Sequence, residues 1–428
     1  MTRRHEVVRR RSHRTAVLLL WALGLPACRP APYAATASRY VYIWAGDKDE
    51  KDSDFLAVVD VRPQSATYGE VIATEPVGMT GSLPHHLEYE LPDSGQLLFA
   101  NGHHHEAIFL FDSRVADHPR LVRTLPPVAP YRFPHDMVRL PNRHLLVGYL
   151  RSDGPSPLPS DSTMPGGHGG IAELDTNGVL LRSASAADSA FQVPIRPYSF
   201  AILPAIDRVV MTSAVMMEDT SADVLQFWRL SDFHLLRTLQ VPPALLPNGR
   251  VLPHGHGLPF EPRVMPDGSV LLNAYGCGFY RVTDIDQATP RIENVYSIDV
   301  PPEQMGACGV PVVVGHYWIM TVGSLHALVT LDIEDPARPR EVSRLLADTT
   351  FRPHWAAKDP GANRMIVGAE NGGENRMLMA RIDTTTGRLS WDTSLHSADG
   401  GLGISFQRAQ WPHGSTGEAF GHAALFRR

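Results

Sequence analysis

Histidine is the residue type with the clearest capacity for chemistry in this 428-residue sequence, which contains 20 histidines. Several of them open apolar segments that recur along the chain; His86, for example, stands six residues before the turn proline Pro92. The histidines that occupy equivalent positions are His86, His135, His354 and His422. Neutral imidazole is the commonest metal ligand and suits zinc, copper and iron. We therefore expect these four side chains to bind one metal ion, with His85 replacing His86 if the register shifts by one residue.

A simpler interpretation of any one such histidine is a hydrogen bond to a backbone group, but four at equivalent positions favour a metal. Tyr198, Glu261 and Gly309 occupy the same position in other segments. We expect Tyr198 and Glu261 to lie around the metal and to act as supporting contacts or as general acid and base. His413, in the loop before the last apolar segment, is a fifth candidate that could swing toward the metal, and also a candidate for taking up a proton.

Other histidines and two cysteines fall in turns that are expected near the same end of the segments. The run His103 to His105 is interpreted as a solvated loop, and for His254 and His256 a loop role and a ligand role are both left open. Cys277 and Cys308 are expected to lie close enough to form a disulfide, with two buried free thiols as the alternative.

These residues must be positioned by a repeating strand unit. An apolar strand, a turn rich in Pro, Asp, Gly and Asn, and a second apolar strand recur from near residues 84, 133, 196, 259, 307 and 352, and further strands follow. Four antiparallel strands per unit, repeated radially, are typical of a β-propeller blade. The segments Tyr40–Ala45, Phe55–Val61 and Tyr68–Thr74 predict a seventh blade, whose inner strand is the C-terminal run from His422. We predict an all-β, seven-bladed propeller over residues 38–428, closed by its C-terminal strand.

The first 37 residues indicate export. Several arginines precede the apolar run Ala16–Leu25, which is too short to span a bilayer. Leu25-Pro26-Ala27-Cys28 resembles a lipoprotein signal, with Cys28 as the lipid-anchored residue, and Ala35-Thr36-Ala37 is a second cleavage option. We expect a periplasmic protein or a membrane-anchored lipoprotein, with an uncleaved anchor as the remaining alternative.

Charge and motifs exclude several classes of function. The formal net charge of −6 provides no basic surface for nucleic acid. No G-x-S-x-G elbow, P-loop, dinucleotide fingerprint or C-x-x-C zinc motif occurs in the sequence.

Three phrases carry a resemblance to a known family: PHHLEYELPDSGQLLFANG from Pro84, YVYIWAGDKDEKDSDFLAVVDV from Tyr40, and DIEDPARPREVSRL from Asp332. They resemble bacterial relatives of the selenium-binding protein and methanethiol oxidase family. The resemblance implies a seven-bladed propeller with a copper ion on His86, His135, His354 and His422. It also implies oxidation of a small thiol by O2, since methanethiol oxidases convert methanethiol to formaldehyde, hydrogen sulfide and hydrogen peroxide.

One departure concerns selenium. The Cys-x-x-Cys segment of the vertebrate members has no counterpart here, because residues 45–53 contain no cysteine. Selenium binding by that route is not expected. Two alternatives to a copper oxidase stay open: an iron oxygenase, by analogy with the four-histidine propellers of carotenoid-cleaving dioxygenases, and a non-catalytic metal-binding or selenium-binding scaffold.

Overall fold

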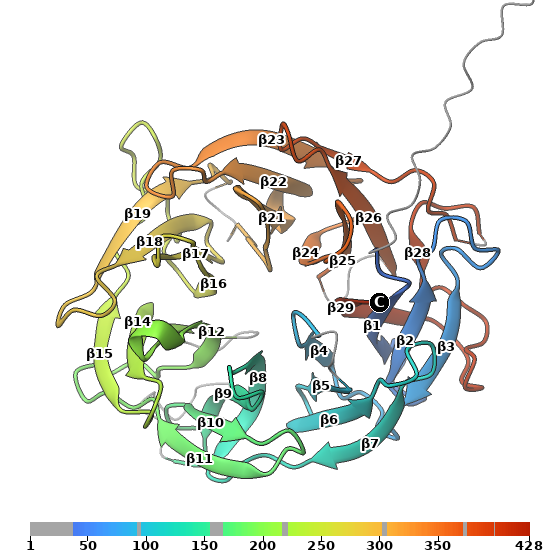
Figure 1. Ribbon diagram of the computed structural model, residues 1–428, viewed down its shortest axis with the longest axis horizontal. Coiled ribbons are helices and arrows are strands. Elements are labelled where there is room, and N and C mark those ends of the chain that lie inside the picture. Colours follow the sequence, from blue (N-terminus) through green and yellow to red (C-terminus); the bar gives the residue numbers. More distant parts are fainter. Residues whose placement is uncertain are drawn as a thin grey trace, which may run out of the picture. The chain divides into compact units, whose positions relative to one another are not determined.

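Short apolar strands joined by turns build seven antiparallel sheets, which stand around a common centre (Figure 1). The computed structural model describes residues 37–91, 96–154, 166–215, 221–301, 306–370, 375–397 and 399–428. They lie in a unit that spans residues 34–428. The expected export signal, including Cys28, lies outside the described residues. Within the described ranges, no helix has the length and apolar character needed to cross a membrane.

The blades are numbered from the N-terminus, and each is given from its inner to its outer strand. Blade 1 contains β29 (Ala419–Arg427), β1 (Tyr40–Asp47), β2 (Phe55–Asp60) and β3 (Val71–Pro76). Blade 2 contains β4 (Pro84–Leu87), β5 (Leu97–Gly102), β6 (Ala107–Asp112) and β7 (Arg120–Leu125). Blade 3 contains β8 (Tyr131–Arg139), β9 (Leu145–Ser152), β10 (Gly170–Leu174) and β11 (Leu180–Ser185). Blade 4 contains β12 (Pro197–Leu203), β13 (Arg208–Ser213), β14 (Val224–Arg229) and β15 (Leu235–Gln240).

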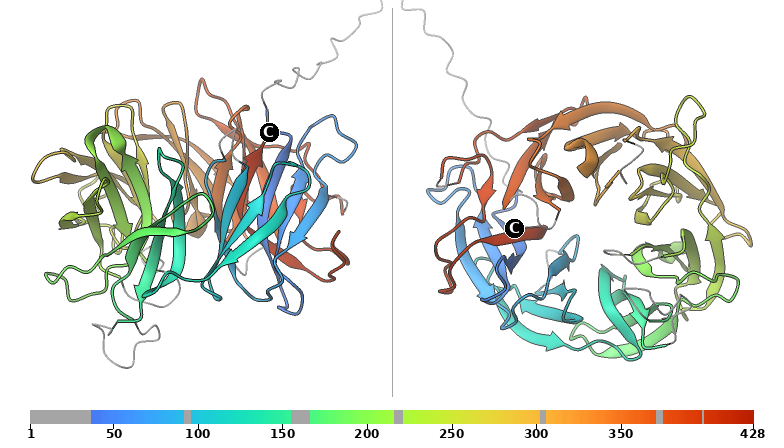
Figure 2. Two further views of the ribbon diagram at one scale, coloured as in Figure 1. Left: turned by 60° about the horizontal axis from the view of Figure 1, so that its bottom comes forward. Right: turned by 180° about the vertical axis from the view of Figure 1, so that it is seen from behind.

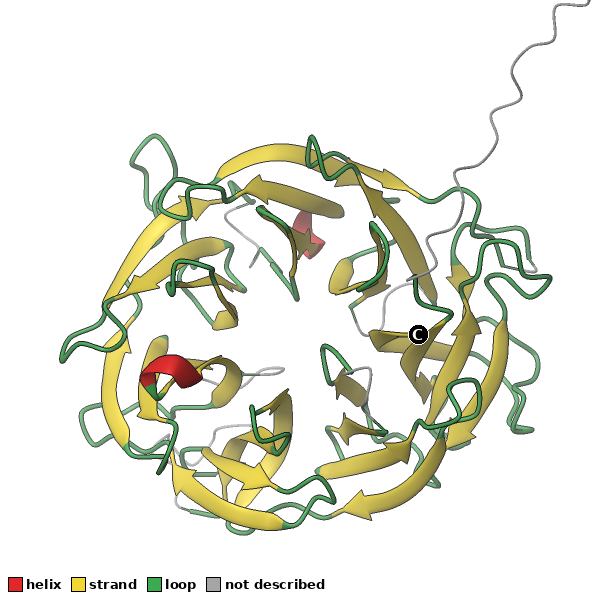
Figure 3. Ribbon diagram, viewed as in Figure 1, coloured by secondary structure: helices red, strands yellow, loops and turns green. Residues whose placement is uncertain are grey.

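The last three blades follow the same order. Blade 5 contains β16 (Pro259–Val264), β17 (Val270–Ala274), β18 (Gly278–Thr283) and β19 (Arg291–Ser297). Blade 6 contains β20 (Val312–Val314), β21 (Tyr317–Val322), β22 (Ala327–Asp332) and β23 (Arg340–Leu346). Blade 7 contains β24 (Pro353–Lys358), β25 (Arg364–Ala369), β26 (Arg376–Ile382) and β27 (Leu389–Trp391), and β28 (Ile404–Ser405) pairs with β26. Two single-turn 3-10 helices lie in connections between strands of the described chain: η1 (Pro204–Ile206) between β12 and β13, and η2 (Gly323–Leu325) between β21 and β22 (Figure 3).

The predicted closure is confirmed. β29 pairs with β1 from Tyr40↔Arg427 to Asp47↔Ala419, so the two ends of the described chain share one sheet (Figure 2, right). A buried ion pair of blade 7 holds the start of β1: Arg364 Nε lies 2.8 Å from Asp359, Arg364 donates to Ser38 O, and Asp359 accepts the Ser38 backbone N–H at 3.1 Å. Closure removes the exposed strand edges that an open ring would leave.

Burial follows the position of a strand within its blade. In blade 1, the second strand β1 and the third strand β2 are buried over their whole length, because neighbouring blades pack on both faces of the sheet. The outer strand β23 alternates exposed and half-buried residues, as expected for a strand with one face toward solvent. The core therefore lies between the blades.

The inner strands carry β-bulges where they enter the centre. In blade 2, Pro84 pairs with Gly102 and Leu87 with Ala100, so His85 and His86 together oppose Asn101. In blade 3, His135 and Asp136 oppose Gly148 in the same way. A bulge breaks the alternation of side chains along a strand and is commonly found beside functional sites. Neighbouring residues can therefore both point toward the centre.

Hydrogen bonds between blades hold these bulges. Asn101 donates to the backbone oxygens of Pro134 (2.7 Å) and His135 (2.9 Å) in blade 3 and accepts the backbone N–H of His86. Thr212 of blade 4 donates to Phe260 O at 2.7 Å, and Thr321 of blade 6 donates to His354 O at 2.9 Å. These bonds are buried, so losing a donor costs about 1–3 kcal/mol where the carbonyl has no second donor.

Candidate metal centre

Six histidines are buried together at the inner ends of blades 7, 1, 2 and 3: His85, His86, His103, His135, His354 and His422. The ring centroids of His86 and His135 are 4.3 Å apart, those of His85 and His422 are 4.4 Å apart, and those of His354 and His422 are 5.1 Å apart. The structure thus brings together all five histidines that were predicted as ligands, and adds His103.

Three of these residues meet most closely. One ring nitrogen each of His85, His86 and His135 lies within 4.8 Å of the others. The sequence predicted either His85 or His86 at this point, depending on register. The structure places both in the cluster, because the bulge opposite Asn101 cancels the expected alternation.

Backbone carbonyls orient two of the rings. Nδ1 of His135 donates to Tyr198 O at 2.9 Å, and Nδ1 of His422 donates to His85 O at 2.7 Å. A neutral imidazole that donates from Nδ1 keeps its lone pair on Nε2. The hydrogen bond to the carbonyl thus fixes the tautomer and the orientation in which Nε2 can bind a metal. Within the described part of the chain, Nε2 of His135 and both ring nitrogens of His86 have no hydrogen-bond partner.

The cluster is electrically neutral at ordinary pH. Burial lowers the pKa of His135 and of His422 to about 3, and that of His354 to about 4. Burial, and then the neighbouring imidazoles, hold the pKa of His85 and His86 well below the usual range. Neutral buried imidazoles, of which His86 and His135 have nitrogens with no partner in the described part of the chain, form a donor set that fits a metal ion.

His103 was not predicted as part of the site. Its side chain is fully buried, its ring centroid is 5.5 Å from that of His85, and neither ring nitrogen bonds to any described residue. The expectation of a solvated turn is wrong for His103, whereas His104 and His105 are exposed. His103 stands in the turn after β5, and its backbone N–H donates to Leu83 O at 3.1 Å, which holds the residue beside the start of β4; no local sequence pattern indicates this contact.

The buried carboxylate Asp136 was also not predicted as part of the site. Its Oδ1 lies 3.8 Å from Nδ1 of His86, and Ser199 Oγ donates to its Oδ2 at 2.7 Å. Burial, followed by the charge of Glu261, raises the pKa of Asp136 to about 7. The bulge that accommodates His135 turns this next residue toward the histidines as well.

Glu261 lies where the sequence predicted, beside the cluster and fully buried. Tyr89 Oη donates to both of its oxygens (3.0 and 2.9 Å), and Arg263 donates to Oε2 at 3.0 Å. The Tyr89 ring lies parallel to the Trp355 ring, with centroids 5.5 Å apart, and Trp355 contacts His86. Beyond these rings lies a cavity of about 170 Å³ that Tyr89, Arg263 and Trp355 help to line.

Aromatic side chains face the histidines from blades 4 and 5. The Tyr198 ring lies 3.9 Å from that of His135 and 4.3 Å from that of Phe260. Tyr275 contacts Phe260, lies 6.5 Å from His354 between ring centroids, and donates its hydroxyl to Glu370 of blade 7 at 2.7 Å. The site is therefore asymmetric, with imidazoles on one side and an aromatic wall on the other.

His413 does not reach the cluster. Its Nδ1 lies 2.7 Å from Thr74 Oγ1 on β3, the outer strand of blade 1, and its ring packs on Phe55. The loop that precedes β29 passes over the outside of blade 1, so the expected approach of His413 to the metal is wrong. His254 is exposed, and His256 lies 3.9 Å from Asp223.

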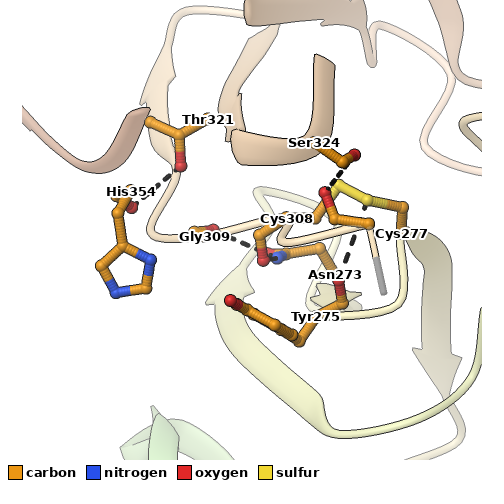
Figure 4. Close-up of a disulfide and its surroundings, with 9 residues drawn as sticks. Asn273, Tyr275, Cys277, Cys308, Gly309, Thr321, Ser324 and His354 are labelled. Atoms are coloured by element: carbon orange, nitrogen blue, oxygen red, sulfur yellow. Dashed lines mark hydrogen bonds between the residues drawn. A yellow bond between two sulfur atoms is a disulfide. The ribbon is translucent and has the colours of Figure 1, made fainter. Parts of the chain in front are cut away.

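The open question about the cysteines is answered by a disulfide. Cys277, in the turn after β17, and Cys308, before β20, are bonded, with Cα atoms 5.2 Å apart (Figure 4). The bond joins blade 5 to blade 6, on the side of the centre that also carries His354.

Comparison with known proteins gives both sequence and fold relatives. A methanethiol oxidase from Hyphomicrobium is 26% identical over 230 residues, and the match spans about half of each protein (49% and 49%). A hypothetical selenium-binding protein from Sulfolobus tokodaii has the same fold, with a TM-score of 0.72 at 15% identity over 92% of this chain and 94% of that one.

Another solved structure matches this fold with a lower TM-score. A periplasmic gluconolactonase from Pseudomonas aeruginosa has a TM-score of 0.59 at 13% identity, over 82% of this chain and 94% of that one. No protein-family model matches the sequence. The chain is thus similar to the selenium-binding protein and methanethiol oxidase family, in sequence over half its length and in fold over nearly all of it.

Proposed function

We propose that the histidine cluster binds a copper ion and that the protein uses it to oxidise a small thiol with O2. The observation that carries this proposal is the set of neutral, buried imidazoles of which His86 and His135 hold nitrogens without a partner among the described residues. Leaving such groups unpaired is unfavourable by about 1–3 kcal/mol each. A metal ion relieves that cost.

The ligands would be His86, His135, His354 and His422, with His85 within reach. Bound copper would supply a soft centre for a thiolate sulfur and the capacity to exchange electrons with O2. The protein itself holds the imidazoles neutral by burial and fixes His135 and His422 through backbone carbonyls. Burial of the cluster also limits the access of bulk water.

We assign the proton chemistry to Glu261. Its carboxylate is buried beside the cluster, and Tyr89 Oη and Ser199 Oγ lie within 3.4 Å of it, which gives a route for the proton that the thiol loses. Tyr198 holds His135 through its carbonyl and forms part of the aromatic wall, against which the alkyl group of a small thiol would pack.

Oxygen uptake tests this function. Protein loaded with copper is supplied with methanethiol, the substrate that the name of the Hyphomicrobium relative indicates, and the consumption of oxygen is followed. Turnover that depends on copper and is lost in His86→Ala supports the proposal; His104→Ala, an exposed neighbour of the cluster, is the matched control and should be fully active. Turnover with iron instead would favour an iron oxygenase. Stable copper without turnover would favour a binding protein.

We also propose that the protein works outside the cytoplasm, as a periplasmic protein or a lipoprotein anchored at Cys28. The Cys277–Cys308 disulfide supports this, because disulfides persist in oxidising compartments. Fractionation of cells that express the full chain tests it: recovery of the processed protein from the cytoplasm alone would contradict it. A shift from membrane to periplasm in Cys28→Ser would identify the lipid anchor.

A further inference from the structure

We infer that the Cys277–Cys308 disulfide positions the ligand His354, so that an oxidised seam between blades 5 and 6 is required for the complete metal site. The inference rests on the proposed function, because His354 matters here as a ligand.

His354 is the bulge residue of its own strand. In blade 7, Pro353 pairs with Ala369 and Trp355 pairs with Gly368, so His354 has no partner of its own on β25. Its carbonyl oxygen is instead bonded twice by blade 6, by Val310 N at 2.8 Å and by Thr321 Oγ1 at 2.9 Å. The backbone of this ligand is thus held by the neighbouring blade.

That neighbouring segment has little strand pairing to hold it. β20 has only three residues and is the shortest of the seven inner strands, and residues 306–311 before it pair only through the isolated bridge between Cys308 and Val322 within the described chain. The disulfide lies in this segment, two residues before Val310 (Figure 4). It supplies a covalent restraint where the sheet ladder is reduced to this one bridge, which Gly309 N–Thr321 O (3.0 Å) and Gly323 N–Ala307 O (2.9 Å) form.

Blade 5 adds further contacts around the same bond. Cys308 N donates to Tyr275 O at 3.0 Å, and Asn273 Nδ2 donates to Cys308 O at 2.8 Å and to Gly309 O at 3.1 Å. These contacts connect blade 5, through Cys308, Gly309 and Val310, to His354. A Cβ at residue 309 would lie 2.2 Å from His354 O, so the segment packs directly on the ligand's backbone, and only glycine fits there.

The other ligands do not depend on this seam. Asn101 accepts the backbone N–H of His86 and donates to His135 O, and both residues lie in blades 2 and 3. His422 is bonded to His85 O. Without the disulfide, the triad of His85, His86 and His135 should still bind copper, while His354 is released or displaced.

The experiment compares the folded, metal-free wild type with Cys277→Ser/Cys308→Ser, Thr321→Val and Thr212→Val. Thr212→Val is the matched control: it removes the same kind of buried bond between neighbouring blades, to Phe260 O, which belongs to no proposed ligand. Thr321→Val removes one of the two bonds to His354 O, leaves the bond from Val310 N and keeps the disulfide, so it tests how blade 6 positions the same ligand if the double variant fails to fold. Cu(II) affinity is measured by competition with a chelator, and the nitrogen hyperfine pattern of the copper by electron paramagnetic resonance.

The disulfide variant and Thr321→Val should each bind copper about 10- to 100-fold more weakly than the wild type, the usual effect of removing a contact that orients a ligand. They should also lose one coupled nitrogen, whereas Thr212→Val should match the wild type. Wild-type affinity and spectrum in both the folded disulfide variant and Thr321→Val would overturn the inference while leaving the copper site intact. An equal loss in Thr212→Val would overturn it too, because the effect would then be general. A wild type that binds no copper would refute the proposed function itself, and this inference with it.

Discussion

The imidazole of His422 donates to the backbone oxygen of His85 at 2.7 Å, although 337 residues separate them in the sequence. His422 lies on β29 and His85 on β4, so this contact forms only when the C-terminal strand closes the ring between blades 7 and 2. The metal site is therefore complete only when the C-terminal strand β29 has closed the ring.

Two changes at β29 should separate closure from metal binding. His422→Gln keeps the strand and the glutamine can still donate a hydrogen bond, so we expect thermal unfolding within a few degrees of the wild type and weakened copper binding. Ending the chain at Gly417 removes β29 and exposes the β1 edge, so it should abolish both cooperative unfolding and copper binding. Calorimetry and metal analysis measure the two properties; wild-type copper affinity in His422→Gln would contradict the assignment of this residue as a ligand.

Acidification should destabilise the metal-free protein. The pKa of His354 is about 4 in the folded protein, against about 6.5 in an unfolded chain. Because the folded value is the lower one, the contribution to stability is fully present above pH 6.5 and is lost as the pH falls toward 4. The loss is about 1.4 kcal/mol per pH unit for each such histidine.

Urea unfolding at pH 7, 6 and 5 checks this dependence. His354→Gln, which cannot titrate, should reduce the slope by about one proton, and the exposed-residue control His104→Gln should leave it unchanged. An identical slope in His354→Gln and the wild type would show that His354 does not remain neutral in the folded state.

His103 offers a test of an unpaired buried group. Both of its nitrogens are unpartnered among the described residues, and its ring packs on Phe133. Replacing it by phenylalanine removes the polar atoms and keeps an aromatic ring, so the metal-free protein should gain about 1–2 kcal/mol of stability. His104→Phe, on the surface, should change stability by less than about 0.5 kcal/mol. A loss of stability in His103→Phe, measured by urea unfolding, would mean that its nitrogens have partners in solution.

Glu261→Gln tests the proposed proton acceptor. The amide keeps the shape of the carboxylate and can still accept from Tyr89 and Arg263, but it cannot take up a proton. We expect kcat for thiol oxidation to fall at least about 100-fold, the usual contribution of a general base, with copper content unchanged. Asp267→Asn, an exposed-turn carboxylate in the same blade, is the control. Unchanged kcat in Glu261→Gln would remove Glu261 from the mechanism.

The blades and the four equivalent histidines could be predicted because both depend on local pattern. Turn residues separate the strands, and His86, His135 and His354 each stand six residues before a turn proline, while His422 opens the closing strand, so the four were expected on one side of the centre. The pairing of the two chain ends followed from a missing strand at the N-terminus and an unpaired one at the C-terminus.

What could not be predicted depends on bulges and on contacts between blades. The residue order does not distinguish a regular strand at His85 from a bulged one. The sequence therefore could not predict that both His85 and His86, or both His135 and Asp136, face the centre. The path of the loop that carries His413 is set by its packing on Phe55 and Thr74, which lie far away in sequence. The burial of His103 depends on how the turn after β5 packs beside the start of β4, which no local sequence pattern indicates.

The most direct test of the account is the metal content of the purified, fully oxidised protein, measured by mass spectrometry of the elements after expression with copper and iron both supplied. We expect one copper per chain in the wild type and in His104→Ala, and little or no copper in the double variant His86→Ala/His135→Ala. Copper absent from the wild type, or retained in full by the double variant, would contradict it.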